Sequence, residues 1–309
     1  MSRVPDLREI PELPDEIIQA ALDGNLVLFV GAGTSMLLGL PSWSGMARRQ
    51  LEFLRENDAL NYSELDQLVS LNPKMQLSIA RELADENRLE LDFSSGLTGY
   101  TEGNSVYRLI NDIGCVCVTT NYDELLAPRY TDVEDGSETP RKVNRICQKN
   151  DFLVTHLDTP GTVIHLHGAV SDQSTMVVTT REYLEHYDDS FVQDFLSDLF
   201  ARKTVLFIGY GLEEAEILEH ILRRGEVGKR EERARFVLQG YYLSQTPLYN
   251  KLHSYYRNSF GVHVIGFVRD HKDYEQQEVI LTDWAPKIVV KRPPLAVGMA
   301  LMAEVFGDG

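Results

Sequence analysis

The sequence has few cysteines, and they are not spaced to bind a metal. Only three occur, Cys115, Cys117 and Cys147, and none forms a CxxC pair with another. Structural zinc sites are commonly built on such pairs, and disulfide frameworks need more cysteines in a regular pattern. The sequence therefore predicts no zinc or other metal site and no disulfide, as expected in the reducing cytoplasm.

The chain also lacks long apolar runs and an excess of positive charge. No stretch approaches the roughly 20 apolar residues that span a bilayer. Residues 1–24 are acidic and have no apolar core, unlike a secretory signal. The 47 acidic residues outnumber the 30 basic ones, which gives a net charge of −17. These absences predict a cytoplasmic protein with no membrane contact and argue against direct binding to nucleic acid.

The sequence is organised around a glycine turn that follows an apolar run at residues 26–30. The turn consists of five small residues: Gly31, Ala32, Gly33, Thr34 and Ser35. A short apolar run that stops at glycines is typical of a buried parallel strand. The glycines let the backbone approach a ligand, and the next helix offers N–H groups to a phosphate. Because Met36 stands at the third glycine position of a GxGxxG motif, the turn alone is weak evidence for a nucleotide site.

Apolar runs alternate with helical patterns along most of the chain. Further strands are predicted at residues 113–120, 162–166, 204–208, 235–239 and 262–267, with short ones at 151–155 and 176–178. Helices are predicted at residues 14–23, 44–58, 180–200 and 213–224, with a short one after 121. This alternation predicts an α/β fold, a Rossmann-like doubly wound parallel sheet with helices on both faces.

The chain divides into one large domain with additions at both ends. Residues 1–24 are predicted to form an N-terminal helical segment, residues 25–270 the Rossmann-like domain, and residues 271–309 a C-terminal tail. Between about residues 59 and 110, apolar positions show helical spacing and no strand pattern. This stretch predicts a helical insertion or subdomain, broken at Pro73.

Four of the predicted strands end in residues that suit a ligand site. Their end sequences are GAGTS at 31–35, TTNYD at 119–123, HLHG at 165–168 and GYG at 209–211. The carboxyl ends of parallel strands meet at one edge of a sheet, and ligands of such sheets bind there. We therefore expect all four sequences to converge on one crevice.

The residues at these strand ends have structural and functional interpretations. Asn121 either shapes a turn or holds a sugar hydroxyl or a water molecule, and Asp123 either caps a helix or accepts from an amide of a ligand. Of His165 and His167, one is expected to pack in the core and the other, before a glycine, to act as a general base. Ser35 either caps a helix or binds a phosphate.

In this order, the four motifs resemble the sirtuin family, and in particular the bacterial SIR2-like proteins that consume NAD. GAGTS resembles the family's dinucleotide-binding turn, and GLPSW, with Pro41 and Trp43, resembles its cofactor-binding loop. TTNYD matches the segment of the catalytic asparagine, here Asn121. HLHG matches that of the catalytic histidine, here His167. FIGYGL at residues 207–212 resembles the adenosine-side loop.

The resemblance implies an NAD+ glycohydrolase that converts NAD to nicotinamide and ADP-ribose. The cofactor-binding residues that it implies are Gly31, Ala32, Gly33, Thr34, Ser35, Pro41, Trp43, Asp123, Gly209, Tyr210 and Gly211. The sirtuin deacylases carry a zinc module on two CxxC pairs and an arginine in the cofactor loop, and this chain has neither. These departures favour hydrolysis of NAD. A deacylase, an ADP-ribosyltransferase and a non-catalytic NAD- or ADP-ribose-binding subunit remain alternatives.

An enzyme that destroys NAD has to be restrained, and the resemblance implies a regulated effector of bacterial antiphage defence. By analogy, the sensor is expected to be a separate partner, such as a HerA-type ring ATPase or an Argonaute-like protein. Assembly into a homo-oligomer is expected as well. The N-terminal helix, the helices of residues 59–110 and the tail after 271 are the expected assembly surfaces.

Overall fold

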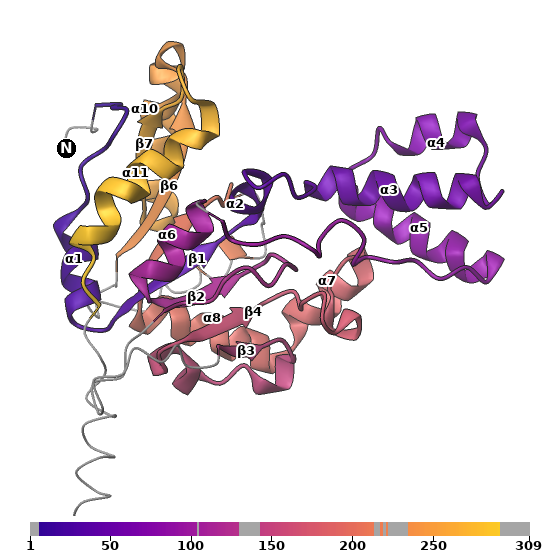
Figure 1. The fold of residues 1–309 in the computed structure, drawn as a ribbon, viewed down its shortest axis with the longest axis horizontal. Helices are drawn as coiled ribbons and strands as arrows, with labels where there is room; N and C mark the ends of the chain where they lie inside the picture. Colours follow the sequence, from indigo (N-terminus) through magenta and orange to yellow (C-terminus); the bar gives the residue numbers. More distant parts are fainter. Residues whose placement is uncertain are drawn as a thin grey trace, which may run out of the picture.

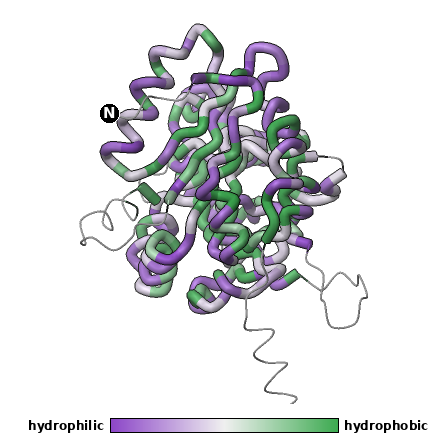
Figure 2. The backbone as a smooth tube through the Cα atoms, turned by 90° about the vertical axis from the view of Figure 1, so that its left-hand side faces the viewer, coloured by the Kyte–Doolittle hydropathy of each residue, from purple (hydrophilic) through white to green (hydrophobic). Residues whose placement is uncertain are grey.

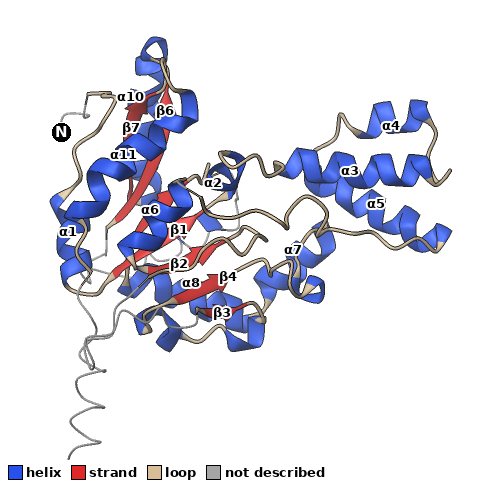
Figure 3. Ribbon diagram, viewed as in Figure 1, coloured by secondary structure: helices blue, strands red, loops and turns tan. Residues whose placement is uncertain are grey.

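A computed structural model of the chain describes residues 6–103, 105–129, 143–212, 217–218, 221 and 234–290. At its centre lies a seven-stranded sheet in which every neighbouring pair of strands is parallel (Figures 1 and 3). The strand order is β3-β4-β2-β1-β5-β6-β7. The strands are β1 (Leu26–Val30), β2 (Val116–Thr119), β3 (Asn144–Ile146), β4 (Thr162–His165), β5 (Thr204–Ile208), β6 (Arg235–Tyr241) and β7 (Val262–Val268).

Helices cover both faces of this sheet. One face packs against α8 (Ser190–Arg202) and α10 (Thr246–Phe260). The other packs against α1 (Asp15–Leu22), α6 (Val106–Ile113) and α11 (Gln276–Trp284). The tube in Figure 2 is accordingly most hydrophobic in its central strands. Both faces being covered confirms the predicted doubly wound α/β fold.

The central strand β1 shows why the strands read as continuous apolar runs. Leu26, Leu28 and Val30 belong to the core under α1 and α6, whereas Val27 and Phe29 belong to the core under α8 and α10. Successive side chains of a strand point to opposite faces, so a strand covered on both sides must be apolar at every position. No helix among the described residues is both long and apolar enough to cross a membrane.

Three helices stand together to one side of the sheet and have a small core of their own (Figure 1). They are α3 (Trp43–Glu56), α4 (Tyr62–Leu68) and α5 (Pro73–Asn87), and we call them the helical subdomain. Its extent differs from the predicted 59–110, because α3 packs against α5 while α6 packs on the sheet. The expected break at Pro73 is confirmed, because α4 ends at Leu68 and α5 begins with Pro73, at a helix position that needs no N–H partner.

Several smaller predictions were wrong, each for a local reason. Residues 121–127 form no helix and residues 176–178 form no strand. Residues 151–155 form no strand either, because they connect two short 3-10 helices, Lys149–Asp151 and Val154–Asp158. The single helix expected from residue 180 is two helices, α7 (Thr180–Asp188) and α8, because the side chain of Asp189 caps the second one. The short edge strand β3 was missed because it has only one apolar residue. Most of the helix predicted at 213–224 lies outside the described residues.

The glycine turns after β1 and β5 interlock at the centre of the sheet. β1 and β5 are neighbours, and the chain passes to the other half of the sheet between them. The Gly31 N–H donates to the Ile208 carbonyl at 2.9 Å, and the Gly33 N–H donates to the Gly209 carbonyl at 2.8 Å. A Cβ on Gly33 would lie only 2.8 Å from the Gly209 carbonyl oxygen. The two turns therefore need glycine in order to approach each other, at the switch point where ligands of such sheets bind.

We expect Gly33→Ala to lower the free energy of unfolding by about 1–3 kcal/mol, as overpacking a tight contact does. Gly45→Ala is the matched control. Gly33 lies in the short helix α2 (Ala32–Met36) and Gly45 lies in α3, but a Cβ on Gly45 would meet its nearest atom, Pro41 Cβ, at an ordinary 3.4 Å. Urea denaturation of both variants measures the difference. Equal stability of the two variants would contradict the interlocked turns.

Candidate active site

A cavity of about 760 Å³ lies beyond the carboxyl ends of β1, β2, β4 and β5. Its volume falls within the range of small-molecule and cofactor sites. The predicted residues that line it are Ala32, Gly33, Ser35, Pro41, Trp43, Asn121, Asp123, His167, Gly209, Tyr210 and Gly211. The predicted convergence of four strand ends is therefore confirmed. Gly31 and Thr34 do not line the cavity, and the buried Thr34 hydroxyl donates to the Gly31 carbonyl at 2.7 Å.

The far wall of the cavity comes from residues that the sequence did not point to. The helical subdomain contributes Asn72, Pro73 and Lys74 at the start of α5, and α7 contributes Tyr183. These residues sit at helix starts or within helices, away from any strand end. The other residues were predicted from their position at the carboxyl ends of parallel strands, and that criterion does not apply to residues in helices.

Four buried side chains form a hydrogen-bond network on the floor of the cavity. Asp123 Oδ2 accepts from the Ser35 hydroxyl at 2.8 Å and from the Tyr107 hydroxyl at 3.0 Å. The Asn121 amide nitrogen lies 2.9 Å from Ser35 Oγ and 3.1 Å from the Tyr107 hydroxyl. Burial and the neighbouring Asp123 raise the pKa of Tyr107, so its phenol stays protonated and remains a donor. Sequence reasoning missed Tyr107, because this residue lies on the apolar face of α6.

This network fixes the orientation of the Asn121 amide. Its nitrogen also donates to the Gly31 carbonyl at 3.1 Å, and a carbonyl oxygen can only accept. The amide therefore cannot be flipped. Asn121 is 5% exposed, and its Oδ1 has no hydrogen-bond partner among the described residues. A buried amide oxygen without a partner is costly, so this atom is suited to accept a hydrogen bond from a ligand hydroxyl or a water molecule.

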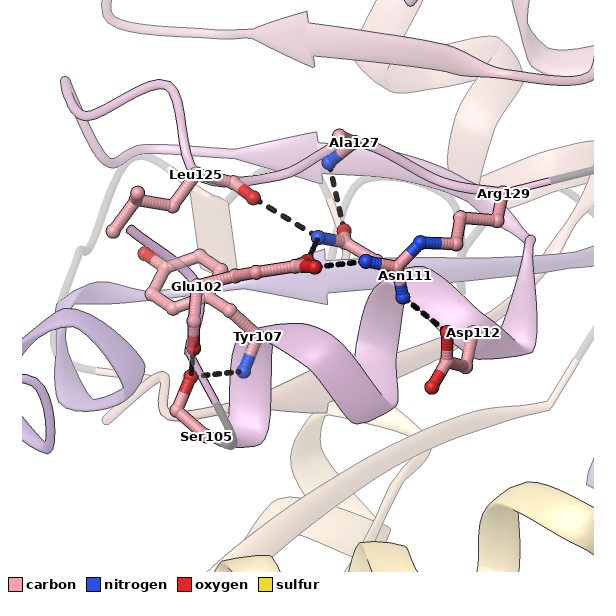
Figure 4. A network of polar contacts seen from close by, with 8 residues as sticks. All are labelled: Glu102, Ser105, Tyr107, Asn111, Asp112, Leu125, Ala127 and Arg129. Carbon is pink, nitrogen blue, oxygen red and sulfur yellow. Dashed lines mark hydrogen bonds and ion pairs between the residues drawn. The ribbon is translucent and has the colours of Figure 1, made fainter. Parts of the chain in front are cut away.

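The segment after Asn121 forms no helix, and the side chain and backbone of Asn111 bind its backbone instead (Figure 4). The Asn111 side chain donates to the Leu125 carbonyl at 3.0 Å and accepts from the Ala127 N–H at 2.7 Å, while its own carbonyl accepts from the Arg129 N–H at 2.7 Å. Glu102 binds both the Asn111 amide, at 2.7 Å, and the Arg129 guanidinium. These contacts with Asn111 bind backbone groups that would otherwise bond to one another within a helix.

One interpretation of the sequence was that Asp123 caps a helix. This is wrong, because no helix follows Asp123. Its Oδ1 accepts from the Leu125 N–H at 3.2 Å, which is a local turn, and its Oδ2 holds the two hydroxyls of Ser35 and Tyr107. Asp123 thus anchors the floor of the cavity. Its contact with an amide of a ligand stays a prediction.

The two histidines near the end of β4 have different environments. His165 packs in the core, as expected for one of the pair, and its Nδ1 donates to the Asn121 carbonyl at 3.1 Å. His167 lines the cavity although it is only 1% exposed. Its Nε2 lies 2.8 Å from the Tyr187 hydroxyl and its Nδ1 lies 3.2 Å from the Tyr183 hydroxyl. Burial, with His186 and Lys74 nearby, holds the pKa of His167 well below its usual range.

The glycine turn is less available to a phosphate than its sequence indicated. The N–H groups of Gly31 and Gly33 donate to carbonyls at the end of β5, and the Ser35 hydroxyl donates to Asp123. Among the described residues that line the cavity, Lys74 is the only lysine or arginine. Its ammonium lies 3.7 Å from the centre of the Tyr183 ring. No cluster of three or more metal-ligating side chains occurs within the described ranges.

Comparisons with known proteins agree with the strand-end motifs. Residues 116–265, which include Asn121, His167 and the turn after β5, match the family model of the SIR2-like domain. The match confirms the resemblance to the SIR2-like family.

Three curated proteins, each named NAD(+) hydrolase ThsA, are similar to the chain. The protein of Cytobacillus dafuensis is 26% identical over 216 residues, and those of Enterococcus faecium and Bacillus cereus (strain MSX-D12) are 24% identical over 212 residues each. These matches cover 68%, 66% and 68% of this chain and 40%, 40% and 41% of the relatives. The chain thus matches about two fifths of the length of these relatives.

The buried histidines should make the fold less stable in mild acid. Burial lowers the pKa of His165 and His167, and it lowers the pKa of His186 from 6.5 to about 4. Below about pH 6.5 the unfolded chain therefore binds more protons than the folded one, and the free energy of unfolding falls as the pH falls. For His186 this window extends down to about pH 4.

Urea denaturation at pH 7 and pH 5 measures this effect. We expect His186→Gln to lose less stability between the two pH values than the unchanged protein. His271→Gln, which replaces a histidine whose side chain is 79% exposed, should keep the original dependence. Equal pH dependence in all three proteins would show that His186 is not buried in its neutral form.

Proposed function

We propose that this chain, which carries a SIR2-like domain, is an NAD+ hydrolase that releases nicotinamide and ADP-ribose. The observation that carries the proposal is the position of Asn121 and His167 in one cavity, together with the glycine turns after β1 and β5. They match the catalytic asparagine and histidine of the family that the sequence resembles. The name of the three relatives, NAD(+) hydrolase, supports the same reaction.

The reaction breaks the bond between nicotinamide and the ribose carbon and leaves an oxocarbenium-like sugar, as in other glycosyl transfers. Nicotinamide departs with the bonding electron pair. A water molecule adds to the ribose carbon and gives up one proton. Asn121 Oδ1 accepts a hydrogen bond from this water molecule or from a ribose hydroxyl, because the amide nitrogen is already committed to Ser35, Tyr107 and Gly31.

His167 is the base that receives the proton. Its lowered pKa keeps the imidazole neutral, and so able to accept a proton, throughout the physiological range. Trp43 packs 5.7 Å from Tyr183 between ring centres and lines the cavity, where it shields the reacting sugar from bulk water. Asp123 and the cofactor loop hold the carboxamide end of NAD.

The pyrophosphate of NAD is held by Lys74. The dinucleotide carries its negative charge on the pyrophosphate, and Lys74 is the only described lysine or arginine on the cavity wall. The start of α5, whose first residues also line the cavity, adds the positive end of the helix dipole.

The cellular role that fits this activity is depletion of NAD in the cytoplasm during bacterial antiphage defence. A separate sensor, such as a HerA-type ATPase or an Argonaute-like protein, restrains the enzyme, and the chain assembles into a homo-oligomer. α4 offers a surface for assembly, because none of its residues is buried and Tyr62 is 75% exposed.

We expect His167→Ala and Asn121→Ala each to reduce the release of nicotinamide from NAD by at least 100-fold, in line with the loss of a general base or of a buried polar contact. His253→Gln is the control, since His253 is buried in α10 and bonded to the Val264 carbonyl, away from the cavity. Chromatography of nicotinamide after incubation with NAD measures the rates.

Other outcomes of the incubation with NAD would identify a different function. Transfer of ADP-ribose from NAD to a protein would identify a transferase, and NAD-dependent removal of an acyl group would identify a deacylase. Binding of NAD without turnover, even with a partner present, would identify a non-catalytic subunit. Equal rates for His167→Ala and the unchanged protein would refute the mechanism.

We expect Lys74→Gln to raise KM for NAD about 10-fold with a smaller effect on kcat, because one charged contact to the pyrophosphate contributes ~1.5 kcal/mol or more. Lys74→Arg should recover most of the affinity. Lys251→Gln, at an exposed position of α10, controls for the change of net charge. An unchanged KM in Lys74→Gln would place the pyrophosphate elsewhere.

A further inference from the structure

Two tyrosines of α7 hold His167 from both sides. Tyr187 binds its Nε2 at 2.8 Å and Tyr183 binds its Nδ1 at 3.2 Å. The two tyrosines are four residues apart, so they lie on the same face of α7. All three side chains are buried. Neither ring nitrogen of His167 is therefore left to bind a ligand directly.

The two tyrosines differ in their access to the cavity. Tyr183 is one of the residues that line it, and Tyr187 is not. The Tyr183 ring also packs 5.7 Å from the Trp43 ring, between ring centres, with the Lys74 ammonium 3.7 Å from its own centre. Tyr183 thus both lines the cavity and binds His167, so it can contact a ligand and the histidine together.

We propose that Tyr183 relays the proton between the ligand and His167, and that Tyr187 is a positioning residue that fixes the tautomer of His167. This inference rests on the proposed NAD+ hydrolase function. It adds one group that touches the substrate and one group that acts only through the histidine.

In the resting state His167 carries its proton on Nε2 and donates it to the Tyr187 oxygen, so Nδ1 is an acceptor for the Tyr183 hydroxyl. As water adds to the ribose carbon, its proton passes to the Tyr183 oxygen while the Tyr183 proton passes to Nδ1. Tyr183 ends neutral, and His167 ends as an imidazolium. The proton then leaves by the reverse path once ADP-ribose departs.

The position of α7 depends on the helical subdomain. The Thr180 N–H donates to the Ser78 hydroxyl of α5 at 2.8 Å, and the two hydroxyls of Ser78 and Thr180 lie 3.1 Å apart. Arg81 of α5 lies 3.8 Å from Glu182. These contacts hold the first turn of α7, so the subdomain that supplies Lys74 also sets the place of Tyr183.

The charged and titratable groups that face His167 come from two helices. Lys74 of α5 and His186 of α7 both disfavour a proton on His167, and Tyr183 and Tyr187 bind its two nitrogens. Because NAD brings a pyrophosphate to Lys74, the bound substrate offsets one of these charges. The imidazolium is therefore easier to form when NAD is in place.

We expect Tyr183→Phe to lower kcat on the order of 100-fold with little change in KM, as the loss of a proton-transfer group does. Tyr187→Phe should lower kcat less, and it should move the acid limb of the kcat–pH profile, because His167 would lose one of its two hydrogen bonds. Tyr249→Phe removes a buried hydroxyl of α10, 3.5 Å from the Val264 carbonyl, and should leave both kcat and the profile unchanged.

Nitrogen NMR of the His167 ring tests the hydrogen bonds of Tyr183 and Tyr187 to this ring without any turnover. We expect Nε2 to carry the proton in the unchanged protein, and Tyr187→Phe to populate both tautomers. A proton on Nδ1 in the unchanged protein would overturn the relay. Full kcat in Tyr183→Phe, in a protein that hydrolyses NAD, would overturn it as well. If the unchanged protein releases no nicotinamide, the proposed function fails. The NMR result still decides whether Tyr187 fixes the tautomer of His167.

Discussion

The site depends on the close approach of two backbone turns at the centre of the sheet. β1 and β5 are adjacent parallel strands, and Gly33 and Gly209 meet where they end. No side chain fits between these turns, so each fixes the height and direction of the other. The cavity opens directly above this contact, because β2 and β4 end at the same edge with Asn121 and His167. The main role of these glycines is therefore to let the two halves of the sheet pack closely, rather than to bind a phosphate.

Above this contact, the floor of the cavity is built from buried polar groups that bond to one another. Ser35, Tyr107 and Asp123 form a closed set of hydrogen bonds, and His165 holds the carbonyl of Asn121. Such groups cannot move independently, since breaking one contact leaves another buried atom unpaired. The Asn121 Oδ1, like Nε2 of His165, has no hydrogen-bond partner in the described part of the chain, and Asn121 is the one of the two residues that lines the cavity. The protein thus holds its asparagine rigidly and leaves one acceptor for the substrate.

The sheet and half of the site could be predicted from the sequence, and the other half could not. Parallel strands covered on both faces have continuous apolar runs. Polar side chains that follow such a run, close to a glycine, are therefore easy to recognise as candidate site residues. Tyr107, Tyr183 and Lys74 lie in helices, where an aromatic residue resembles core packing and a lysine resembles a solvated surface. The segment after Asn121 looked helical because its tertiary bonds to Asn111 have no local signature. Contacts between distant segments decided these positions, and no periodicity reveals them.

The floor of the cavity and the start of α5 belong to parts of the molecule with different hydrophobic cores. The floor is continuous with the cores of the sheet, whereas Lys74 and the first turn of α5 belong to helices packed largely among themselves. The two cores are linked, because Tyr122, Met176 and Val178 pack with the subdomain helices, and Trp43 of α3 packs against the core under α8 and α10. The width of the cavity depends on these shared residues and on contacts between the two parts, such as the hydrogen bond between Ser78 and Thr180. A molecule that gripped only the outer helices could thereby change how firmly a substrate is enclosed, although it touched no residue of the sheet.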